Sequence, residues 1–223
     1  MATLHVVRVF VGPDGTGGNP LGVFLTGGDI DEDRRQAVAA DLGFSETVFV
    51  DDIADGRVRI FTPAAELAFA GHPLVGTAWL LEQDGTWVDS LRPPAGRVAT
   101  WEDDGRRWIR GRADWLPPMT LRRYPSPAAV DALEAPPDGE GLLDAWAWED
   151  EDAGRVRCRV FAPALGVIED EATGAAALRL TAELGRPLLI RQGTGSELRT
   201  RPGPGGTVEV GGRVERVETR AYA

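Results

Sequence analysis

One short segment of this chain occurs twice, and that repetition limits the folds open to the chain more than any other feature. The sequence RIFTPA at residues 59–64 returns as RVFAPA at residues 159–164. Each copy reads as a strand, a short connection and then a helix whose opening carries an ionisable residue and, four positions later, a glycine. These are His72 with Gly76 in the first copy and Asp170 with Gly174 in the second. The repeat predicts two related halves in which His72 and Asp170 hold equivalent positions.

A proline-rich stretch separates the two copies. We therefore expect an N-terminal lobe at residues 1–115, a connecting segment at 116–149 and a C-terminal lobe at 150–223. A chain of 223 residues is long enough for one large domain or for two domains of roughly 100 residues each.

Short β-branched and aromatic runs bounded by Gly, Pro and Asp predict many strands. They lie at 4–11, 21–26, 47–52, 57–63, 96–102, 106–112, 145–150, 155–163, 187–193, 207–212 and 213–218. Helices are expected at 31–43, 72–85 and 172–185, each of which ends in glycine. Strand-rich segments that are each served by one central helix indicate an α+β protein rather than a doubly wound sheet.

The choice of basic and sulfur-containing residues excludes several kinds of chemistry. All 24 basic side chains are arginine, so no lysine is present to form a Schiff base or to hold pyridoxal phosphate. Cys158 is the single cysteine, which excludes a disulfide, a CxxC zinc site and a pair of cysteines acting as acid and base. Within a predicted strand, Cys158 fits a small buried residue better than a reactive thiol. We expect no metal.

The net charge is −11, and the acidic residues lie in short clusters along the chain. This distribution argues against a nucleic acid or an anionic membrane as partner. The apolar run near the N-terminus is too short and lacks the basic leader of a signal peptide. No run approaches the 18 apolar residues of a membrane span, so we expect a cytoplasmic protein.

Two related halves would bring their equivalent helix N-termini to a shared cleft, where free amide N–H groups attract anions. The small residues of AFAGH and ATGAA would let a ligand approach the backbone closely. The sequence thus favours a small carboxylate as ligand.

Four residues are candidates for this site, and each also has a structural interpretation. His72 can exchange a proton near neutral pH or can simply cap backbone groups. Glu46, in the run GFSETVFV, is either a carboxylate held in the cleft or a capping residue at the start of a strand. Asp170 is the natural N-cap of the second central helix, and Asn19 suits a turn next to two glycines.

Together these motifs resemble the PhzF-like family of phenazine biosynthesis, within the diaminopimelate-epimerase-like superfamily. The matching runs are SET at 45–47, GNPLGVF at 18–24, FTPAAELAFAGHPLVGTA at 61–78, FAPALGVIEDEATGAA at 161–176 and VEVGGRVERV at 208–217. The resemblance implies two lobes, each a curved, mostly antiparallel sheet around a central helix, with the active site between them and the second lobe shortened. It also suggests a homodimer.

The same resemblance implies an isomerase without a cofactor, in which one glutamate moves a proton on a small unsaturated cyclic acid. Glu46 would be the general acid/base, and His72 and Asp170 would position and polarise the substrate. The pocket would be lined by Asn19, Gly71, Gly174 and Ala175. Gly71 and Ala175 stand where epimerase relatives carry their two thiols, so a two-thiol mechanism is not expected.

Ala175 also replaces a serine that is usual in the family, and the chain is shorter than typical members around residues 124–149. Two other functions stay open on these grounds. One is a non-catalytic protein that binds a small acid in the same cleft, and the other is an amino-acid epimerase with unusual bases.

Overall fold

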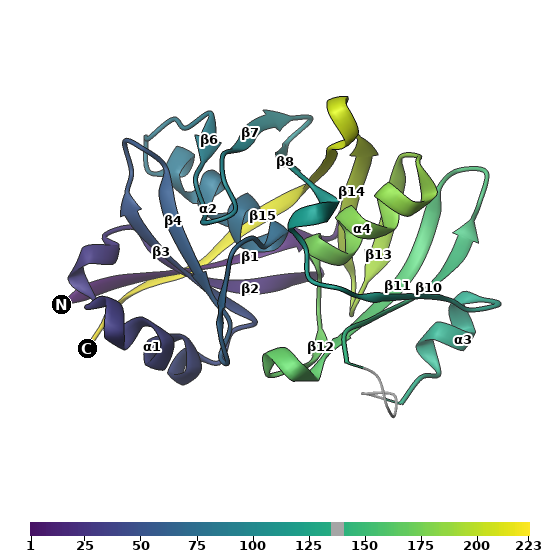
Figure 1. The fold of residues 1–223 in the computed structure, drawn as a ribbon, viewed down its shortest axis with the longest axis horizontal. Coiled ribbons are helices and arrows are strands. Elements are labelled where there is room, and N and C mark those ends of the chain that lie inside the picture. The colour runs from purple at the N-terminus through teal and green to yellow at the C-terminus, as the bar shows by residue number, and fades with distance from the viewer. Residues whose placement is uncertain (135–140) are drawn as a thin grey trace.

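The computed structural model describes residues 1–134 and 141–223, and it shows an α+β fold (Figure 1). The helices are α1 (Arg35–Leu42), α2 (Gly71–Gln83), α3 (Pro127–Asp131) and α4 (Gly174–Leu184). The strands of the first half are β1 (Ala2–Val11), β2 (Gly17–Phe24), β3 (Glu46–Asp52), β4 (Arg57–Phe61), β5 (Glu66–Leu67), β6 (Ser90–Leu91), β7 (Val98–Asp103) and β8 (Arg106–Gly111). The remaining strands are β9 (Thr120–Arg123), β10 (Leu143–Asp150), β11 (Arg155–Ala162), β12 (Val167–Asp170), β13 (Leu188–Gln192), β14 (Ser196–Pro202) and β15 (Val208–Tyr222).

The strands form one continuous, mostly antiparallel sheet. Its main path runs β5-β4-β3-β2-β1-β15-β14-β13-β11-β10-β9, while β12 pairs with β11 and the β7–β8 hairpin joins through β15. The pairs β2–β3, β11–β13 and β9–β10 are parallel. The predicted α+β class is therefore confirmed.

Strand β15 is the longest element and corrects two predictions at once. We expected separate strands at 207–212 and 213–218, but residues 208–222 form a single strand that runs diagonally through the molecule (Figure 1). The glycines in its middle do not mark a turn. A Cβ on Gly211 would lie 2.3 Å from the ring of Trp108, and one on Gly212 would lie 2.4 Å from the ring of Phe10. Glycine is therefore needed there because aromatic rings lie against the strand.

Strand β14, at residues 196–202, was not predicted. Its sequence SELRTRP alternates buried and partly buried positions, but its charged side chains hide the pattern and Thr200 is its single β-branched residue.

Helices α2 and α4 both pack against strands of the sheet. Helix α2 contacts β1, β8 and β15, and α4 contacts β14 and β15. Ten of the 13 residues of α2 are buried, so this helix is apolar on nearly all sides. Pro73 is the third residue of α2, where its missing N–H costs no hydrogen bond. Helix α4 ends at Gly185, whose φ of 63° is the left-handed conformation that glycine adopts readily.

The structure overturns the predicted equivalence of His72 and Asp170. His72 is the second residue of α2, whereas Asp170 is the last residue of β12 and lies four positions before the start of α4. The N-cap of α4 is Thr173, so the prediction of Asp170 as N-cap is also wrong. The reason is that the connection between the repeated strand and its helix is longer in the second copy: Gly71 lies ten positions after Phe61, whereas Gly174 lies thirteen positions after the matching Phe161. The helix starts that correspond are Gly71 and Gly174.

The strand pairing of the sheet crosses between the two predicted lobes. β15 lies within the predicted C-terminal lobe, yet its residues 213–222 pair with β1 along nearly the whole length of β1. The boundaries at 1–115, 116–149 and 150–223 stay a prediction. Residues 135–140 of the connecting segment lie outside the described residues.

Candidate active site

The N-termini of α2 and α4 meet backbone to backbone. A Cβ on Gly71 would lie 3.0 Å from the Cα and carbonyl carbon of Gly174, and a Cβ on Gly174 would lie 2.8 Å from the amide nitrogen of His72. Only glycine fits at both helix starts, because any side chain would press on the opposing backbone. Neither helix receives a side-chain cap at its N-terminus within the described part of the chain. Two sets of first-turn amide groups therefore converge on one spot.

Glu46 and His72 form a close pair beside these helix starts. Glu46 is the first residue of β3, and its Oε2 lies 2.8 Å from Nδ1 of His72. The His72 side chain is 2% exposed and that of Glu46 is 14% exposed. The other ring nitrogen of His72, Nε2, is buried and has no hydrogen-bond partner among the described residues. The sequence-predicted acid/base candidate is thus in direct contact with the predicted histidine.

Asp170 and Asn19 form the second pair of predicted residues. Nδ2 of Asn19 donates to Oδ1 of Asp170 at 2.7 Å and to the carbonyl oxygen of Ala172 at 2.9 Å. The Thr173 hydroxyl donates to the other oxygen of Asp170 at 2.6 Å. Asn19 is therefore not a simple turn residue, since its amide links β2 to the end of β12.

The pKa of Asp170 is raised to about 6 as the net result of opposing effects. Burial is the largest cause of the increase, and the negative charge of Glu46 acts in the same direction. His72 and the hydrogen bonds from Thr173 and Asn19 oppose this shift. Because Glu46 and His72 both influence the pKa of Asp170, the two pairs belong to one electrostatic cluster.

Sequence reasoning missed the side chains that hold Asp170 in place. Gln192, at the end of β13, is buried and donates from Nε2 to the carbonyl oxygen of Asp170 at 2.8 Å and to the Thr173 hydroxyl at 2.9 Å. Its Oε1 accepts from the amide of Thr173 at 3.0 Å. The Ser45 hydroxyl donates to Oδ1 of Asn19 at 3.0 Å. A polar residue at the end of an apolar strand, as in LLIRQ, was the available signal for Gln192.

A small cavity of about 60 Å³ lies against this cluster. Its polar lining comes from Ser45, Glu46, Thr62, Asp170 and Thr173. Its apolar lining comes from Leu67, Phe69, Ala70, Pro117, Met119, Leu142, Ala162, Leu165, Val167 and Ala175. None of these lining residues, all within the described ranges, is basic. The cavity is thus an apolar space with two carboxylates among its few polar groups.

The predicted site residues differ in how they relate to this cavity. Glu46, Asp170 and Ala175 line it. Asn19 and His72 are not among its lining residues and touch it only through their hydrogen bonds to Asp170 and Glu46. Gly71 and Gly174 were predicted to line the pocket, but neither is among its lining residues, and both pack against each other instead.

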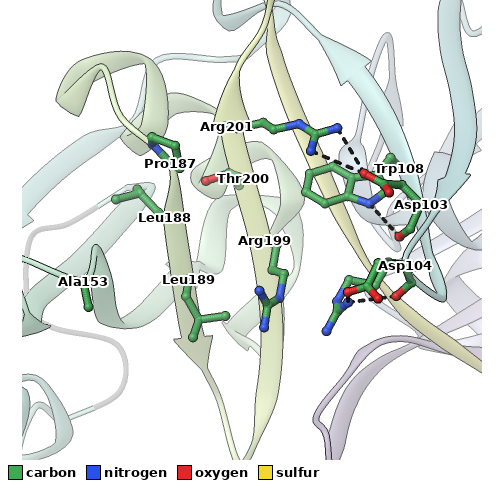
Figure 2. A pocket seen from close by; sticks show the side chains of 11 residues that line it. Asp103, Asp104, Trp108, Ala153, Pro187, Leu188, Leu189, Arg199, Thr200 and Arg201 are labelled. Carbon is green, nitrogen blue, oxygen red and sulfur yellow. Dashed lines mark hydrogen bonds and ion pairs between the residues drawn. The ribbon is translucent and has the colours of Figure 1, made fainter.

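A second hollow, of about 330 Å³, lies between the β7–β8 hairpin and strands β13 and β14 (Figure 2). Figure 2 shows Arg201 beside the ring of Trp108 and bonded to Asp103. Arg201 also bonds Glu209, and Arg106 bonds Asp104. The charged side chains Arg201, Asp103, Arg106 and Asp104 are therefore all engaged in ion pairs. For this reason we do not take the hollow as the candidate active site.

Cys158 and its neighbour Asp144 lie apart from the cavity. Cys158 is buried, as predicted. Burial is the main cause that raises the pKa of its thiol, and the nearby Asp144 carboxylate raises this pKa further. A thiol of this kind is inert.

Residues 1–134 and 141–223 contain no group of three or more His, Cys, Asp or Glu side chains placed to hold a metal ion. No helix within the same ranges is long and apolar enough to cross a membrane.

Comparison with known proteins identifies relatives of this chain. The family described as phenazine biosynthesis-like protein matches residues 9–110. A trans-2,3-dihydro-3-hydroxyanthranilate isomerase from Pseudomonas aeruginosa is 35% identical to this chain, and the match covers 81% of this chain and 79% of that protein.

Solved structures share the fold at lower identity. A phenazine biosynthesis protein of the PhzF family from Bacillus anthracis is 18% identical and superimposes with a TM-score of 0.80, covering 100% of this chain and 99% of that one. A probable proline racemase from Agrobacterium radiobacter is 12% identical, with a TM-score of 0.63 over 100% of this chain and 93% of that one.

Proposed function

The chain belongs to the phenazine biosynthesis-like (PhzF) family and is a PhzF-like isomerase, and we propose that it moves a proton on a small unsaturated cyclic carboxylic acid without a cofactor. The observation that carries this proposal is the Glu46 carboxylate, which lines the cavity while His72 holds one of its oxygens. The 35% identical relative acts as trans-2,3-dihydro-3-hydroxyanthranilate isomerase, so a related ring acid is the first substrate to test.

In this mechanism Glu46 is the general acid/base. The hydrogen bond from His72 engages Oε2 and orients the carboxylate, which leaves Oε1 to take a proton from one ring carbon and return it to another. Glu46 suits this role because its carboxyl group lines the cavity and is only 14% exposed. One group can then perform both transfers.

Asp170 binds and polarises the substrate. Its two oxygens accept hydrogen bonds from Asn19 and Thr173, which favour the ionised form, although burial raises its pKa to about 6. An ionised Asp170 at the cavity wall accepts a hydrogen bond from a substrate amino or hydroxyl group.

The substrate carboxylate faces the converging helix N-termini. No arginine is among the cavity-lining residues of the described ranges, so backbone amides of α2 and α4 are the groups that suit an anion there.

In the same proposal, residues 1–115 and 150–223 form two lobes that share β15. The proposal also takes the molecule to be a homodimer, and sedimentation velocity would test this oligomeric state.

Proton exchange with solvent tests the chemistry directly. The purified protein and its Glu46→Gln variant are incubated in deuterated buffer with trans-2,3-dihydro-3-hydroxyanthranilate and related cyclic acids, and NMR follows isomerisation and deuterium uptake. We expect the variant to lose about 10²- to 10⁴-fold of the rate, the contribution typical of a general acid/base. The matched control is Glu66→Gln, because Glu66 lies outside the cavity and pairs with Arg59. Equal rates in the wild type and Glu46→Gln would contradict the proposed role of Glu46.

One observation favours a second function, that of a protein that binds a small acid without turning it over. Ala175 presents a methyl group to the cavity where the family usually carries serine, so a hydrogen bond to the substrate is missing. Saturable binding of these acids without deuterium uptake would support that function.

A further inference from the structure

One wall of the cavity comes from the segment that joins the two halves. Pro117, Met119 and Leu142 all line the cavity, and Met119 also lines a second, open groove of about 480 Å³. The groove is otherwise lined by Leu121, Arg123, Trp146, Arg179, Glu183 and Leu184. Met119 therefore borders both the small cavity and a larger, open groove whose lining is partly apolar and partly charged.

The backbone on both sides of Met119 is held in place. Nη2 of Arg179, on α4, donates to the carbonyl oxygens of Leu116 and Pro117, each at 3.0 Å. On the other side, the amide of Thr120 donates to the carbonyl oxygen of Leu142 at 2.9 Å and begins the pairing of β9 with β10. The backbone at Met119 is thus fixed on both sides, so its side chain stays in the wall that the cavity and the groove share.

The size of the cavity makes this wall important. A volume of about 60 Å³ is far below the roughly 300 Å³ at which ordinary ligand pockets begin. A ring acid larger than the cavity must gain space at one of its walls. The open groove beyond Met119 offers that space, since Leu121, Trp146 and Leu184 continue the apolar surface.

We propose that Met119 is a specificity-determining residue. Its side chain closes the cavity toward the groove and excludes acids that carry an apolar extension on the ring. A shorter side chain at position 119 joins the cavity to the groove, so that the extension lies over Trp146 and Leu184. This inference rests on the proposed function, because it assumes that the cavity holds the ring of a small acid.

Binding of a graded set of acids tests the inference without requiring turnover. Calorimetry measures the Kd of benzoate, 4-ethylbenzoate and 4-butylbenzoate for the wild type, Met119→Ala and Met119→Leu. We expect the wild type and Met119→Leu to bind 4-butylbenzoate at least 10-fold more weakly than benzoate. In Met119→Ala the two acids should bind within about 3-fold of each other.

Val167→Ala is the matched control, because Val167 lines the cavity but not the groove. It enlarges the cavity on another side and should keep the wild-type discrimination. Equal loss of discrimination in Val167→Ala and Met119→Ala, or unchanged discrimination in Met119→Ala, would overturn the inference and leave the proposed function intact. Failure of benzoate to bind the wild type at all would count against an acid-binding cavity and so against both. If Met119→Ala does not fold, Met119→Val serves in its place.

Discussion

At the residue scale, Asp144 is a buried carboxyl group that the proposed mechanism does not use. It lies on β10, is 1% exposed, and its Oδ1 has no hydrogen-bond partner among the described residues. Cys158 on β11, diagonally opposite Asp144, hydrogen-bonds to it. Burial raises the pKa of Asp144 to about 7. An ionised carboxylate at this place is costly because a hydrogen bond from a thiol, which is a weak donor, compensates for little of its lost hydration.

This cost predicts how stability depends on pH. The folded state keeps the Asp144 proton up to about pH 7, whereas the unfolded chain releases it near the ordinary value of 3.8. The free energy of unfolding should therefore fall as pH rises from about 4 to about 7, by up to roughly 4 kcal/mol from this group. Asp144→Asn should remove that part of the slope and should be more stable than the wild type at pH 8. Urea unfolding at pH 5 and pH 8 measures both.

The exposed Asp152→Asn variant is the control and should follow the wild-type curve. Identical pH dependence in the wild type and Asp144→Asn would show that Asp144 is hydrated or paired in the folded protein.

At the element scale, the contact between the starts of α2 and α4 fixes the geometry of the site. His72 lies in the first turn of one helix, and Thr173, which directly precedes the other helix, donates a hydrogen bond to Asp170. A small change in the distance between the helices would therefore move Glu46 and Asp170 relative to each other.

Gly174→Ala tests this contact. The added Cβ would lie 2.8 Å from the His72 amide nitrogen and 2.9 Å from the Cα of Gly71, both of which are backbone atoms that cannot rotate away. We expect a loss of about 1 to 3 kcal/mol in the free energy of unfolding, together with weaker binding of benzoate by calorimetry. Gly28→Ala should be nearly neutral, since a Cβ there meets no atom within 4 Å among the described residues. A fully stable Gly174→Ala variant with normal binding would mean that the helices separate at little cost.

At the scale of the whole molecule, β15 joins the two halves. It pairs with β1 over residues 213–222 and with β14 and β8 over residues 208–212. A further link connects the halves near the site, where the Ser196 hydroxyl accepts a hydrogen bond from the amide of Gly18 at 2.8 Å. Neither half can complete its sheet without β15.

The protein should therefore unfold as one cooperative unit. Hydrogen exchange measured by mass spectrometry in increasing urea should give the same midpoint for peptides from residues 46–61 and from residues 155–170. Far-ultraviolet circular dichroism supplies an independent probe of the same transition. Two separate midpoints would indicate that the halves fold independently despite the shared strand.

The sequence alone determined the kinds of elements and the identity of the acid/base candidates. Periodic apolar runs and glycine stops are local signals, so the α+β class and the helices near 72–83 and 174–184 followed from them. The motifs around Glu46, His72 and Asp170 pointed to one site for the same reason, because each is a short run of neighbouring residues.

The tertiary structure alone decided which residues meet. Gln192 reaches Asp170, Asn19 reaches Asp170 from β2, and Met119 lines the cavity, and each contact joins segments far apart in the chain. It also showed that Gly71 corresponds to Gly174 rather than His72 to Asp170, and that β15 is a single strand. Such facts depend on strand register, on connection length and on rings that occupy the space beside a glycine. These are properties of packing, and no local pattern in the sequence encodes them.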